Sequence, residues 1–517
     1  MNELVAALLK PDAWPFPVKR VEHLETHISH LFLVGDYVYK VKKPVDLGFL
    51  DFSTLERRRF FCEEEVRLNS RMAPGIYLAA VPITRNGDAF QVEGEGVPVE
   101  YTVKMRRFDQ AGLLDRHPLN AEIIDALAQR VADFHASIPA APSESEWGRP
   151  EKVWFPVEQN YRQVRELGLF PQFAHRLTSL EEKARQCFRE IRDLVEQRRA
   201  EGFIRECHGD MHLGNIAWVE GEVLVFDGIE FNPDLRWIDV ANDIAFLLMD
   251  LEYRGEQRMA WRFLNRYLEL TGDYAAARLL PFYKAYRAMV RAKVAAIRLA
   301  QEGGESERLQ QEFTGYLEYA ERCLAPGGRS VLCITHGLSG SGKSHFCLGM
   351  RERLGMIHLR SDLERKRLFG LAPEAGSRSA VEGGIYTPEA TQRTYGRLQE
   401  LAGELLDGGY SVVVDATFLE AVRRARFRAL AEAHGACFRI LTIEAPESVL
   451  RERVAVRSRE GGDPSEADLA VLERQLEKQE PLTPAEVESA VRVDTTREPD
   501  WEALRKSLAC GARKEKR

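Results

Sequence analysis

The sequence predicts a multidomain protein, in which an α+β domain at residues 1–325 precedes an α/β domain with a parallel sheet at residues 326–517. Three observations lead to this prediction. The chain has 517 residues, which is too long for one ordinary hydrophobic core. The clearest linker is Pro326-Gly327-Gly328. Before this linker, strands and helices are expected in separate blocks, whereas after it they alternate, as in a parallel sheet.

The composition excludes several classes of protein. Hydrophobic residues make up 44% and charged residues 29% of the chain, which excludes a mostly disordered, collagenous or membrane-embedded protein. The net charge of −8 argues against wholesale coating of nucleic acid. Eight cysteines without CxxC spacing disfavour zinc and redox-dithiol sites and favour reduced thiols. We therefore expect a cytoplasmic protein with no membrane partner, and the sequence does not indicate its oligomeric state.

The N-terminal domain is expected to have a small lobe at about 20–108 and a helical lobe at about 109–325. In the small lobe, the sequence predicts a hairpin that turns at Gly35-Asp36, a helix at Leu55–Met72 and a strand at Val97–Met105. The second strand of the hairpin, Tyr37–Val41, is followed by Lys42. Lys40 and Lys42 lie on the same face by alternation, so spacing does not separate them.

The helical lobe contains the segment His208–Asn215, which has the spacing H-x-D-x-x-x-x-N. Asp210 would orient or deprotonate a hydroxyl group, and Asn215 would bind Mg²⁺. A hairpin that turns at residues 220–222 is expected to place Asn215 opposite Asp227, about 5 Å away. Asn215 and Asp227 would then be two ligands of one metal site. His212 is expected to be a packed loop residue rather than a metal ligand.

The C-terminal domain carries the pattern G-x-x-x-x-G-K-[ST] after a predicted strand and before a predicted helix. Its glycines would let backbone N–H groups face phosphate. Lys343 would reach the β- and γ-phosphates, and Ser344 would ligate Mg²⁺. The ATP-binding candidates of this loop are Gly337, Leu338, Ser339, Gly340, Ser341, Gly342, Lys343 and Ser344.

Two acids follow other predicted strands of this domain. The strands are predicted at Val331–His336, Met356–Arg360, Ser411–Val414, Phe438–Glu444 and Ala490–Val493. Because the carboxyl ends of parallel strands share one edge, Asp362 and Asp415 should converge on the phosphate loop. Each would hold Mg²⁺ through water or accept a proton. The alternatives are a helix cap for Asp362 and a turn residue for Asp415.

Two groups of arginines lie on predicted helices. Arg453 and Arg457 share a face and would either neutralise a phosphoryl group or form a solvated, ion-paired surface. The second group is more typical of a solvated face than of a nucleic-acid patch, and it consists of Arg423, Arg424, Arg426 and Arg428.

From about residue 27 to 267, the chain resembles aminoglycoside phosphotransferases and related choline-kinase-like enzymes. The resemblance rests on His208–Asn215, which corresponds to the catalytic loop of these enzymes, on Asp227-Gly228, and on the R-x-x-D-x-x-x-D segment that begins at Arg236. It implies a protein-kinase-like fold in which Asp239 and Asp243 hold the catalytic loop.

This resemblance also implies an ATP-binding lysine that is ion-paired with a helix acid. We choose Lys40 and Glu65, with Lys42 and Glu64 as alternatives. A full glycine-rich pattern is missing, and His30–Gly35 stands in the place of the phosphate-covering loop.

From about residue 330 to 496, the chain is similar to small P-loop kinases of the polynucleotide kinase, gluconate kinase and zeta-toxin type. GLSGSGKS, HLRSD, VVVDAT and the arginine-rich helix carry this resemblance. It implies that Asp362 is a catalytic base, that Arg453 and Arg457 bind ATP from a lid, and that Thr495 lies near adenine. Asp415, placed at the same sheet edge, is assigned to the metal.

Both halves therefore predict ATP- and Mg²⁺-dependent transfer of phosphate to hydroxyl groups of small-molecule acceptors, which the sequence does not identify. Two alternatives remain open. One domain could be a nucleotide-sensing module that gates the other. The C-terminal domain could instead be a nucleic-acid 5′-hydroxyl kinase, a reading that the arginine groups favour and the acidic net charge weakens.

Overall fold

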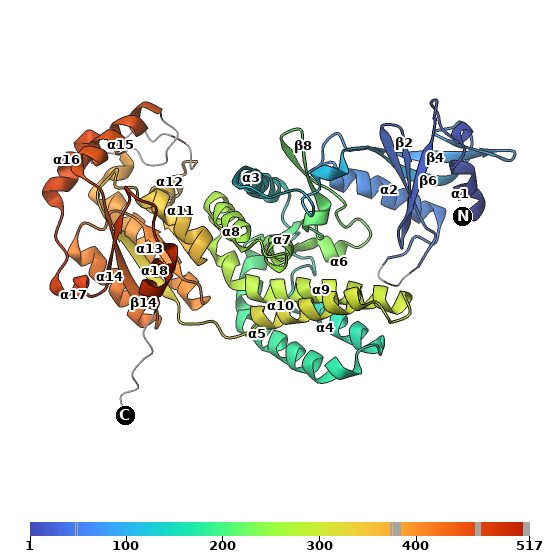
Figure 1. Cartoon of the computed structure of the whole chain (residues 1–517). Helices are drawn as coiled ribbons and strands as arrows, with labels where there is room; N and C mark the ends of the chain where they lie inside the picture. Colours follow the sequence, from blue (N-terminus) through green and yellow to red (C-terminus); the bar gives the residue numbers. More distant parts are fainter. Residues whose placement is uncertain (47, 49, 373–374, 376–383, 461–466, 510–517) are drawn as a thin grey trace. The chain divides into compact units, whose positions relative to one another are not determined.

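The computed structural model describes residues 1–46, 48, 50–372, 375, 384–460 and 467–509. Two compact units are present (Figure 1). The first consists of Met1–Arg254 and Phe282–Leu324, and the second of Gly255–Pro281 and Ala325–Arg517. The second unit thus includes a segment, residues 255–281, that precedes the linker by more than 40 positions and that the sequence prediction placed in the N-terminal domain.

The small lobe of the first unit is an antiparallel six-stranded sheet with the order β1-β2-β3-β6-β4-β5. The predicted hairpin, helix and third strand are all present, as β2–β3, α2 and β6. The elements of this lobe are α1 (Asn2–Leu8), η1 (Pro11–Ala13), β1 (Val21–Glu25), β2 (Ser29–Val34), β3 (Tyr37–Lys42), α2 (Leu55–Asn69), β4 (Tyr77–Asn86), β5 (Ala89–Val92) and β6 (Pro98–Arg106).

The segment that the sequence places where a phosphate-covering loop would lie, His30–Gly35, is mostly strand β2 and ends in the β2–β3 turn. The preceding hairpin, β1–β2, turns at residues 26–28. Which of these segments lies over a phosphate stays a prediction. Strand β1 contains charged residues and is largely exposed, so its sequence gave no clear strand signal.

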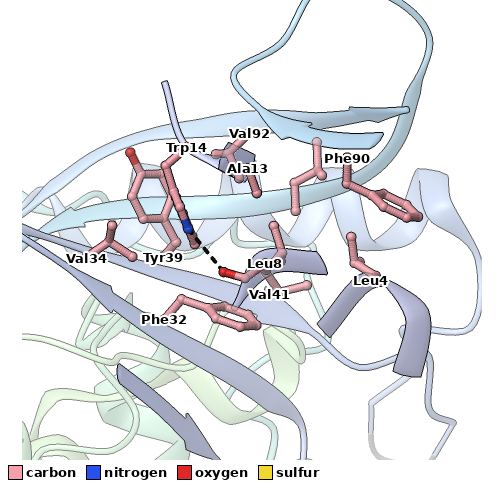
Figure 2. Close-up of a cluster of buried hydrophobic side chains, with 11 residues drawn as sticks. Leu4, Leu8, Ala13, Trp14, Phe32, Val34, Tyr39, Val41, Phe90 and Val92 are labelled. Atoms are coloured by element: carbon pink, nitrogen blue, oxygen red, sulfur yellow. Dashed lines mark hydrogen bonds between the residues drawn. The ribbon is translucent and has the colours of Figure 1, made fainter. Parts of the chain in front are cut away.

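The two faces of strand β3 serve different purposes. Tyr39 and Val41 point to one face and are buried in an aromatic and aliphatic cluster with α1 and β2 (Figure 2). Trp14 lies in this cluster, where its indole N–H donates to the Leu8 carbonyl at 3.1 Å. Because side chains alternate along a strand, Lys40 projects from the opposite face, where it meets α2.

The larger lobe of the first unit is mainly helical. Helix α7 is buried on nearly all sides and forms its centre. The elements are η2 (Gln110–Gly112), α3 (Ala121–Ser137), α4 (Pro150–Glu166), η3 (Pro171–Phe173), α5 (Ala174–Ala200), β7 (Ile204–Glu206), η4 (Leu213–Asn215), β8 (Ile216–Val219), β9 (Glu222–Val225), α6 (Pro233–Arg236), β10 (Trp237–Asp239), α7 (Val240–Tyr253), α9 (Leu280–Gln301) and α10 (Glu307–Cys323).

The β8–β9 hairpin forms, but its register differs from the prediction by one residue. Glu220 and Gly221 both have positive φ, at 52° and 84°, as in a two-residue type I′ turn. Glu222 is therefore the first residue of β9 and pairs with Val219. As a result, Asn215 faces Phe226, whose N–H donates to the Asn215 carbonyl at 3.0 Å, and not Asp227.

The second unit is built around a parallel five-stranded sheet with the order β12-β13-β11-β14-β15, which confirms the predicted α/β class. Helices α11 and α18 share a hydrophobic core with one face of the sheet, and α13 and α14 also pack on its strands (Figure 1). The elements are α8 (Gln257–Thr271), η5 (Tyr274–Leu279), β11 (Val331–His336), α11 (Lys343–Leu354), β12 (Ile357–Arg360), α12 (Ser361–Leu368), η6 (Gly384–Tyr386), α13 (Pro388–Asp407), β13 (Val412–Asp415), α14 (Ala421–Ala433), β14 (Cys437–Glu444), α15 (Glu447–Glu460), α16 (Leu469–Lys478), α17 (Pro484–Val487), β15 (Ala490–Asp494) and α18 (Trp501–Leu508).

The cysteines depart from the expectation in one case. Cys437 is disulfide-bonded, so the expectation that all thiols are reduced is wrong for this residue. Six described cysteines are free: Cys62, Cys187, Cys207, Cys323, Cys333 and Cys347. Separately, no helix among the described residues is long and apolar enough to cross a membrane.

The cluster around Trp14 yields a stability prediction. Trp14→Ala should destabilise the small lobe by about 3–5 kcal/mol, because truncation of a buried aromatic side chain leaves a cavity. Hydrogen exchange of the β2 and β3 amides would measure this loss as a lower free energy of opening. Leu24→Ala is the control, because Leu24 is 57% exposed and should cost less than about 0.5 kcal/mol. Equal losses in the two variants would contradict the prediction.

Candidate active sites

The first candidate site contains a lysine held between two carboxylates. The Lys40 ammonium group donates to Glu65 Oε1 on α2 at 2.8 Å and to Asp227 Oδ1 at 2.7 Å. The structure therefore brings together three residues that lie far apart in the sequence and that the sequence prediction assigned to ATP or metal binding. Their roles in binding remain predictions. Glu64 instead pairs with Arg67 and Arg236.

Lys42 contacts the same buried carboxylate. Its ammonium group is fully buried and lies 2.6 Å from Glu65 Oε2 and 2.5 Å from Glu230 Oε1. Both lysines thus pair with Glu65, but Lys40 reaches Asp227 and Lys42 reaches Glu230. The sequence could not separate the two lysines because both do face α2. Glu230 was missed because it belongs to no recognised motif.

The electrostatics of this network keep Glu65 and Lys40 charged. Burial alone would raise the pKa of Glu65, but Lys40 and Lys42 outweigh burial and lower this pKa to about 2. Burial would lower the pKa of Lys40, yet Asp227, Glu65 and Glu230 hold it well above its ordinary value. Burial raises the pKa of Glu230 itself, and Lys42 opposes that rise.

The predicted catalytic acid or base, Asp210, lies beside Asn215. The Asn215 amide donates to the Asp210 carboxylate and to the Asp210 carbonyl, both at 3.1 Å. Burial would raise the pKa of Asp210, but His212, His208 and Arg287 outweigh it, so this pKa is lowered and the carboxylate stays ionised. His212 Nδ1 accepts the Gly214 N–H at 3.1 Å, which supports the packed-loop reading of His212.

Asp243 holds the catalytic loop in place. Its carboxylate accepts the backbone N–H groups of His208 at 3.1 Å and Gly209 at 2.8 Å, and it also contacts His135 Nε2. Asp239 has a different function from the one predicted. It caps α7 by accepting the Ala241 N–H and forms a buried pair with Arg198 at 2.8–2.9 Å, and among the described residues these side-chain contacts do not reach the catalytic loop.

The donor set of the first site fits Mg²⁺ and a nucleotide. Asp227 presents a half-exposed carboxylate from a backbone with φ of +60°, and its N–H is fixed by the Tyr77 hydroxyl at 3.1 Å. Carboxylate and amide oxygens of Asp227 and Asn215 are hard ligands of the kind that Mg²⁺ prefers. The Lys40 side chain is 13% exposed, and its ammonium group pairs with the half-exposed carboxylate of Asp227. It therefore lies next to the open side of the site, where a phosphate would bind.

The second candidate site is the phosphate loop between β11 and α11. Gly340 and Gly342 have φ of +82° and +87°, which disfavours side chains there. A Cβ atom at Gly340 would also lie 2.6 Å from the Leu450 carbonyl oxygen. The hydroxyl of Ser341 is buried and has no hydrogen-bond partner among the described residues. Tight glycine turns and an unsatisfied hydroxyl are what a phosphate cradle requires.

Lys343 lies at the centre of this second site. Its ammonium group donates to the carbonyls of Gly337 at 3.0 Å and Leu338 at 2.7 Å. Burial lowers the pKa of Lys343, while Asp415 and Asp362 act to raise it and Arg457 acts to lower it. Asp415 and Asp362 therefore lie within electrostatic reach of Lys343, as the shared sheet edge predicts.

Asp415 is the last residue of β13 and is held by a histidine that the sequence analysis missed. Asp415 Oδ2 lies 3.3 Å from His358 Nε2, and both side chains are buried. Burial would raise the pKa of Asp415, but His358 outweighs it and lowers this pKa to about 2. Asp415 and the Ser344 hydroxyl are both oxygen donors suited to Mg²⁺. Asp362 lies in the first turn of α12.

Arg453 of α15 and Thr495 contact the phosphate loop directly. Arg453 donates to the Thr495 hydroxyl at 3.0 Å and to the Gly340 carbonyl at 3.4 Å. The Thr495 hydroxyl donates to the Ser341 carbonyl at 2.7 Å, so it touches the phosphate loop, and its place beside adenine stays a prediction. Arg457 donates to the Ala467 carbonyl at 2.6 Å.

Gln475 on α16 is a further residue that the sequence analysis missed. Its side-chain oxygen accepts the Ser339 N–H at 2.7 Å, one of the loop donors that would face a phosphate. A lone glutamine on a helix carries no sequence signal for such a contact.

The arginines of α14 are not a simple solvated face, which corrects the prediction for them. Arg424 is completely buried and pairs with Glu486 at 2.7 Å, while it also donates to four backbone carbonyls. Arg423 pairs with Glu420, and Arg428 donates to the Ala485 carbonyl. The prediction of a solvated face is therefore wrong for Arg424, whereas Arg426 is exposed as expected.

The contacts of Asp243 yield a pH prediction. Burial would raise its pKa, but His135, His208 and the Gly209 N–H outweigh burial, so the folded-state pKa lies below the ordinary value of 3.8. A lowered carboxylate pKa stabilises the fold above about pH 4, and this contribution disappears as the pH falls through the folded-state pKa. At pH 7, Asp243→Asn should therefore destabilise the first unit by about 2–3 kcal/mol.

The difference in the free energy of unfolding between the wild-type chain and Asp243→Asn should shrink as the pH falls from 5 toward 3. Urea unfolding of both proteins at each pH measures this difference. Asp234→Asn is the control, since Asp234 is an exposed acid of the same unit. A deficit that stays constant over this range would contradict the prediction.

Two family models match different parts of the chain. The model of the phosphotransferase enzyme family matches residues 93–280, and the model of an AAA domain matches residues 332–482. Among solved structures, an amicoumacin kinase is 15% identical over 63% of this chain and 94% of its own, with a TM-score of 0.39. A gluconokinase of Sinorhizobium meliloti is 24% identical over 35% of this chain and 90% of its own, with a TM-score of 0.24.

Other relatives match most of the length of the chain. Uncharacterized proteins of Mycobacterium tuberculosis and Mycobacterium bovis are 30% identical to the chain over 462 residues, which is 87% of this chain and 88% of theirs. The likeness spans both units. The chain therefore belongs to the same family as these mycobacterial proteins, with a domain of the phosphotransferase enzyme family followed by a P-loop domain of the AAA type.

Proposed function

We propose that the protein is an ATP- and Mg²⁺-dependent phosphotransferase with two nucleotide sites, which transfers phosphate to hydroxyl groups of small-molecule acceptors. The observation that carries this proposal is the convergence of Lys40, Glu65 and Asp227 in one ion-paired set. A lysine–glutamate pair beside a metal-binding aspartate is the arrangement that positions nucleotide phosphates in kinase-like enzymes.

In the first site, each residue has a distinct task. Asp210 would accept the proton of the acceptor hydroxyl or orient that hydroxyl. Asn215 fixes the Asp210 carboxylate by a 3.1 Å hydrogen bond, and Lys40 would bind phosphate oxygens. When bound, Mg-ATP would supply the phosphoryl group and offset the charge of its transfer, and Asn215 and Asp227 would hold the metal.

In the second site, the phosphate loop and Lys343 would bind phosphate oxygens, and Ser344 and Asp415 would hold the metal. Asp362 would serve as the base for a second acceptor hydroxyl. Arg453 and Arg457 would face the transferred group from α15. The nucleic-acid alternative has weaker support than the small-molecule reading, because Arg424 is committed to a buried ion pair with Glu486.

The test of this proposal is transfer of labelled γ-phosphate from ATP to a pooled bacterial metabolite extract. Asp210→Asn, measured in a Lys343→Ala background, should lower transfer by the first site about 10²- to 10⁴-fold. Asp362→Asn, measured in an Asp227→Asn background, should lower transfer by the second site to a similar degree. Asp234→Asn should leave both activities unchanged.

Unchanged transfer in either aspartate variant would remove that residue from the mechanism. If instead the first unit binds nucleotide without any turnover, the alternative of a nucleotide-sensing module that gates the second unit would replace the two-enzyme proposal.

Helix α15 offers a matched pair of arginines for a second test. Arg453 contacts the phosphate loop, whereas Arg451 pairs with Glu447 and Glu473 on the exposed side of the helix. Arg453→Met should raise the KM for ATP of the second site about tenfold, because a charged hydrogen bond contributes about 1.5–3 kcal/mol. Arg451→Met should leave this KM within about twofold. Equal effects of the two substitutions would contradict the assignment of Arg453.

A further inference from the structure

The segment Gly255–Pro281 is part of the first domain by sequence and part of the second unit by packing. The phosphotransferase family model extends to residue 280, so it includes α8 and all of η5. In the structure, however, α8 packs against α11 and β12, and η5 packs against α13. Seven residues of α8 are buried: Ala260, Phe263, Leu264, Asn265, Tyr267, Leu268 and Glu269.

Asn265 of this segment completes the edge of the parallel sheet. Strand β12 lies at the end of the strand order, so one side of its backbone has no neighbouring strand. The Asn265 side chain accepts the His358 N–H at 2.8 Å and donates to the Met356 carbonyl at 3.1 Å. Both groups are buried, and unpaired buried backbone groups are costly. The amide therefore replaces a missing strand neighbour.

Glu269, one helical turn after Asn265, reaches the same histidine from its other side. The Glu269 side chain is 3% exposed, and its Oε1 lies 3.8 Å from His358 Nδ1 and 3.4 Å from Arg351 Nη1. The Glu269 carbonyl also accepts the Arg367 guanidinium at 2.6 Å. His358 Nε2 in turn lies 3.3 Å from Asp415 Oδ2. His358 therefore lies between two buried carboxylates: Nε2 is within hydrogen-bond distance of Asp415, whereas Nδ1 has no hydrogen-bond partner among the described residues and meets Glu269 only at ion-pair distance.

We propose that residues 255–281 are an integral part of the P-loop unit, and that Glu269, acting through His358, is a positioning residue for Asp415. The carboxylate of Glu269 lies within ion-pair distance of the ring of His358 and orients it by charge rather than by a hydrogen bond, and the Nε2–H of that ring holds one oxygen of Asp415. The other oxygen is left for the metal. Such outer contacts orient metal ligands, and their loss typically costs 10- to 100-fold in metal affinity. This inference rests on the proposed role of Asp415 at the metal.

The test measures the Mg²⁺ requirement for nucleotide binding, and it does not depend on turnover. A fluorescent ADP analogue is titrated into the full chain, with the first site silenced by Asp227→Asn, with and without Mg²⁺. Glu269→Gln and His358→Phe should raise the Mg²⁺ concentration at half-saturation about tenfold or more. The affinity for Mg²⁺-free ADP should not change, because the loop and Lys343 bind it. His358→Gln, which keeps a donor, should give a smaller rise.

Glu352→Gln is the matched control. Glu352 is 12% exposed, against 3% for Glu269, and it pairs with Arg262 of α8 at 2.6 Å and with Arg351 at 4.0 Å, so its ion pairs are not with His358. The control should leave the Mg²⁺ requirement unchanged. If Glu269→Gln behaves like Glu352→Gln while Asp415→Asn raises the Mg²⁺ requirement, the positioning role of Glu269 is wrong. If Asp415→Asn has no effect, or Lys343→Ala does not weaken ADP binding, the proposed function of this site fails as well.

A second measurement applies if the substitutions prevent folding. In the wild-type chain, MgADP should slow hydrogen exchange of the α8 amides, residues 257–271, because α8 is expected to be part of the P-loop unit. The Lys343→Ala chain should show no such protection. Unchanged exchange of α8 in the wild-type chain on saturation with MgADP would overturn the proposal.

Discussion

The full burial of the Glu65 carboxylate is the constraint on which the first site depends. A buried charge is stable only when it is paired and hydrogen-bonded, and Glu65 satisfies this condition by binding both Lys40 and Lys42. Those two lysines then extend to Asp227 and Glu230. One carboxylate on α2 thereby ties strand β3 to the segment after β9. The position of Asp227 is thus set by charge pairing across the sheet and not by the β8–β9 hairpin alone.

Buried carboxylates also need charged or hydrogen-bonding partners in the second unit. Asp415 and Glu269 are buried acids on different stretches of chain, and His358 lies between them. Arg351 supplies the positive charge that Glu269 needs. In the first unit, the buried carboxylate of Asp243 on α7 is stabilised by backbone N–H groups of the catalytic loop, because it accepts those of His208 and Gly209. Each candidate site therefore rests on a buried acid whose partners lie far away in the sequence.

The sequence predicted the parts of this structure that depend on local patterns. The five parallel strands, the β2–β3 hairpin and the phosphate loop all carry periodicity or motif signals, and they were located to within one or two residues. The errors arise where tertiary contacts decide. The β8–β9 register depends on the positive φ of Glu220, which glutamate rarely adopts. The burial of Arg424 depends on Glu486, 62 residues away. His358 begins the HLRSD segment, but that segment assigned no role to the histidine, and Glu269 belongs to no recognised pattern.

The chain passes from α7 in the first unit to α8 in the second unit and then returns to the first unit with α9. One continuous stretch of sequence therefore supplies helices to both units. Helix α7 carries Asp243, and α9 carries Arg287, which donates to the Gly209 carbonyl at 2.9 Å. Both helices therefore hold the catalytic loop of the first unit. The segment between them, with α8, covers the free edge of β12 in the second unit. A cut at the linker near residue 325 would separate α8 from the sheet that it completes. The P-loop unit is thus discontinuous in sequence, and its sheet edge is finished by residues that the phosphotransferase domain model includes.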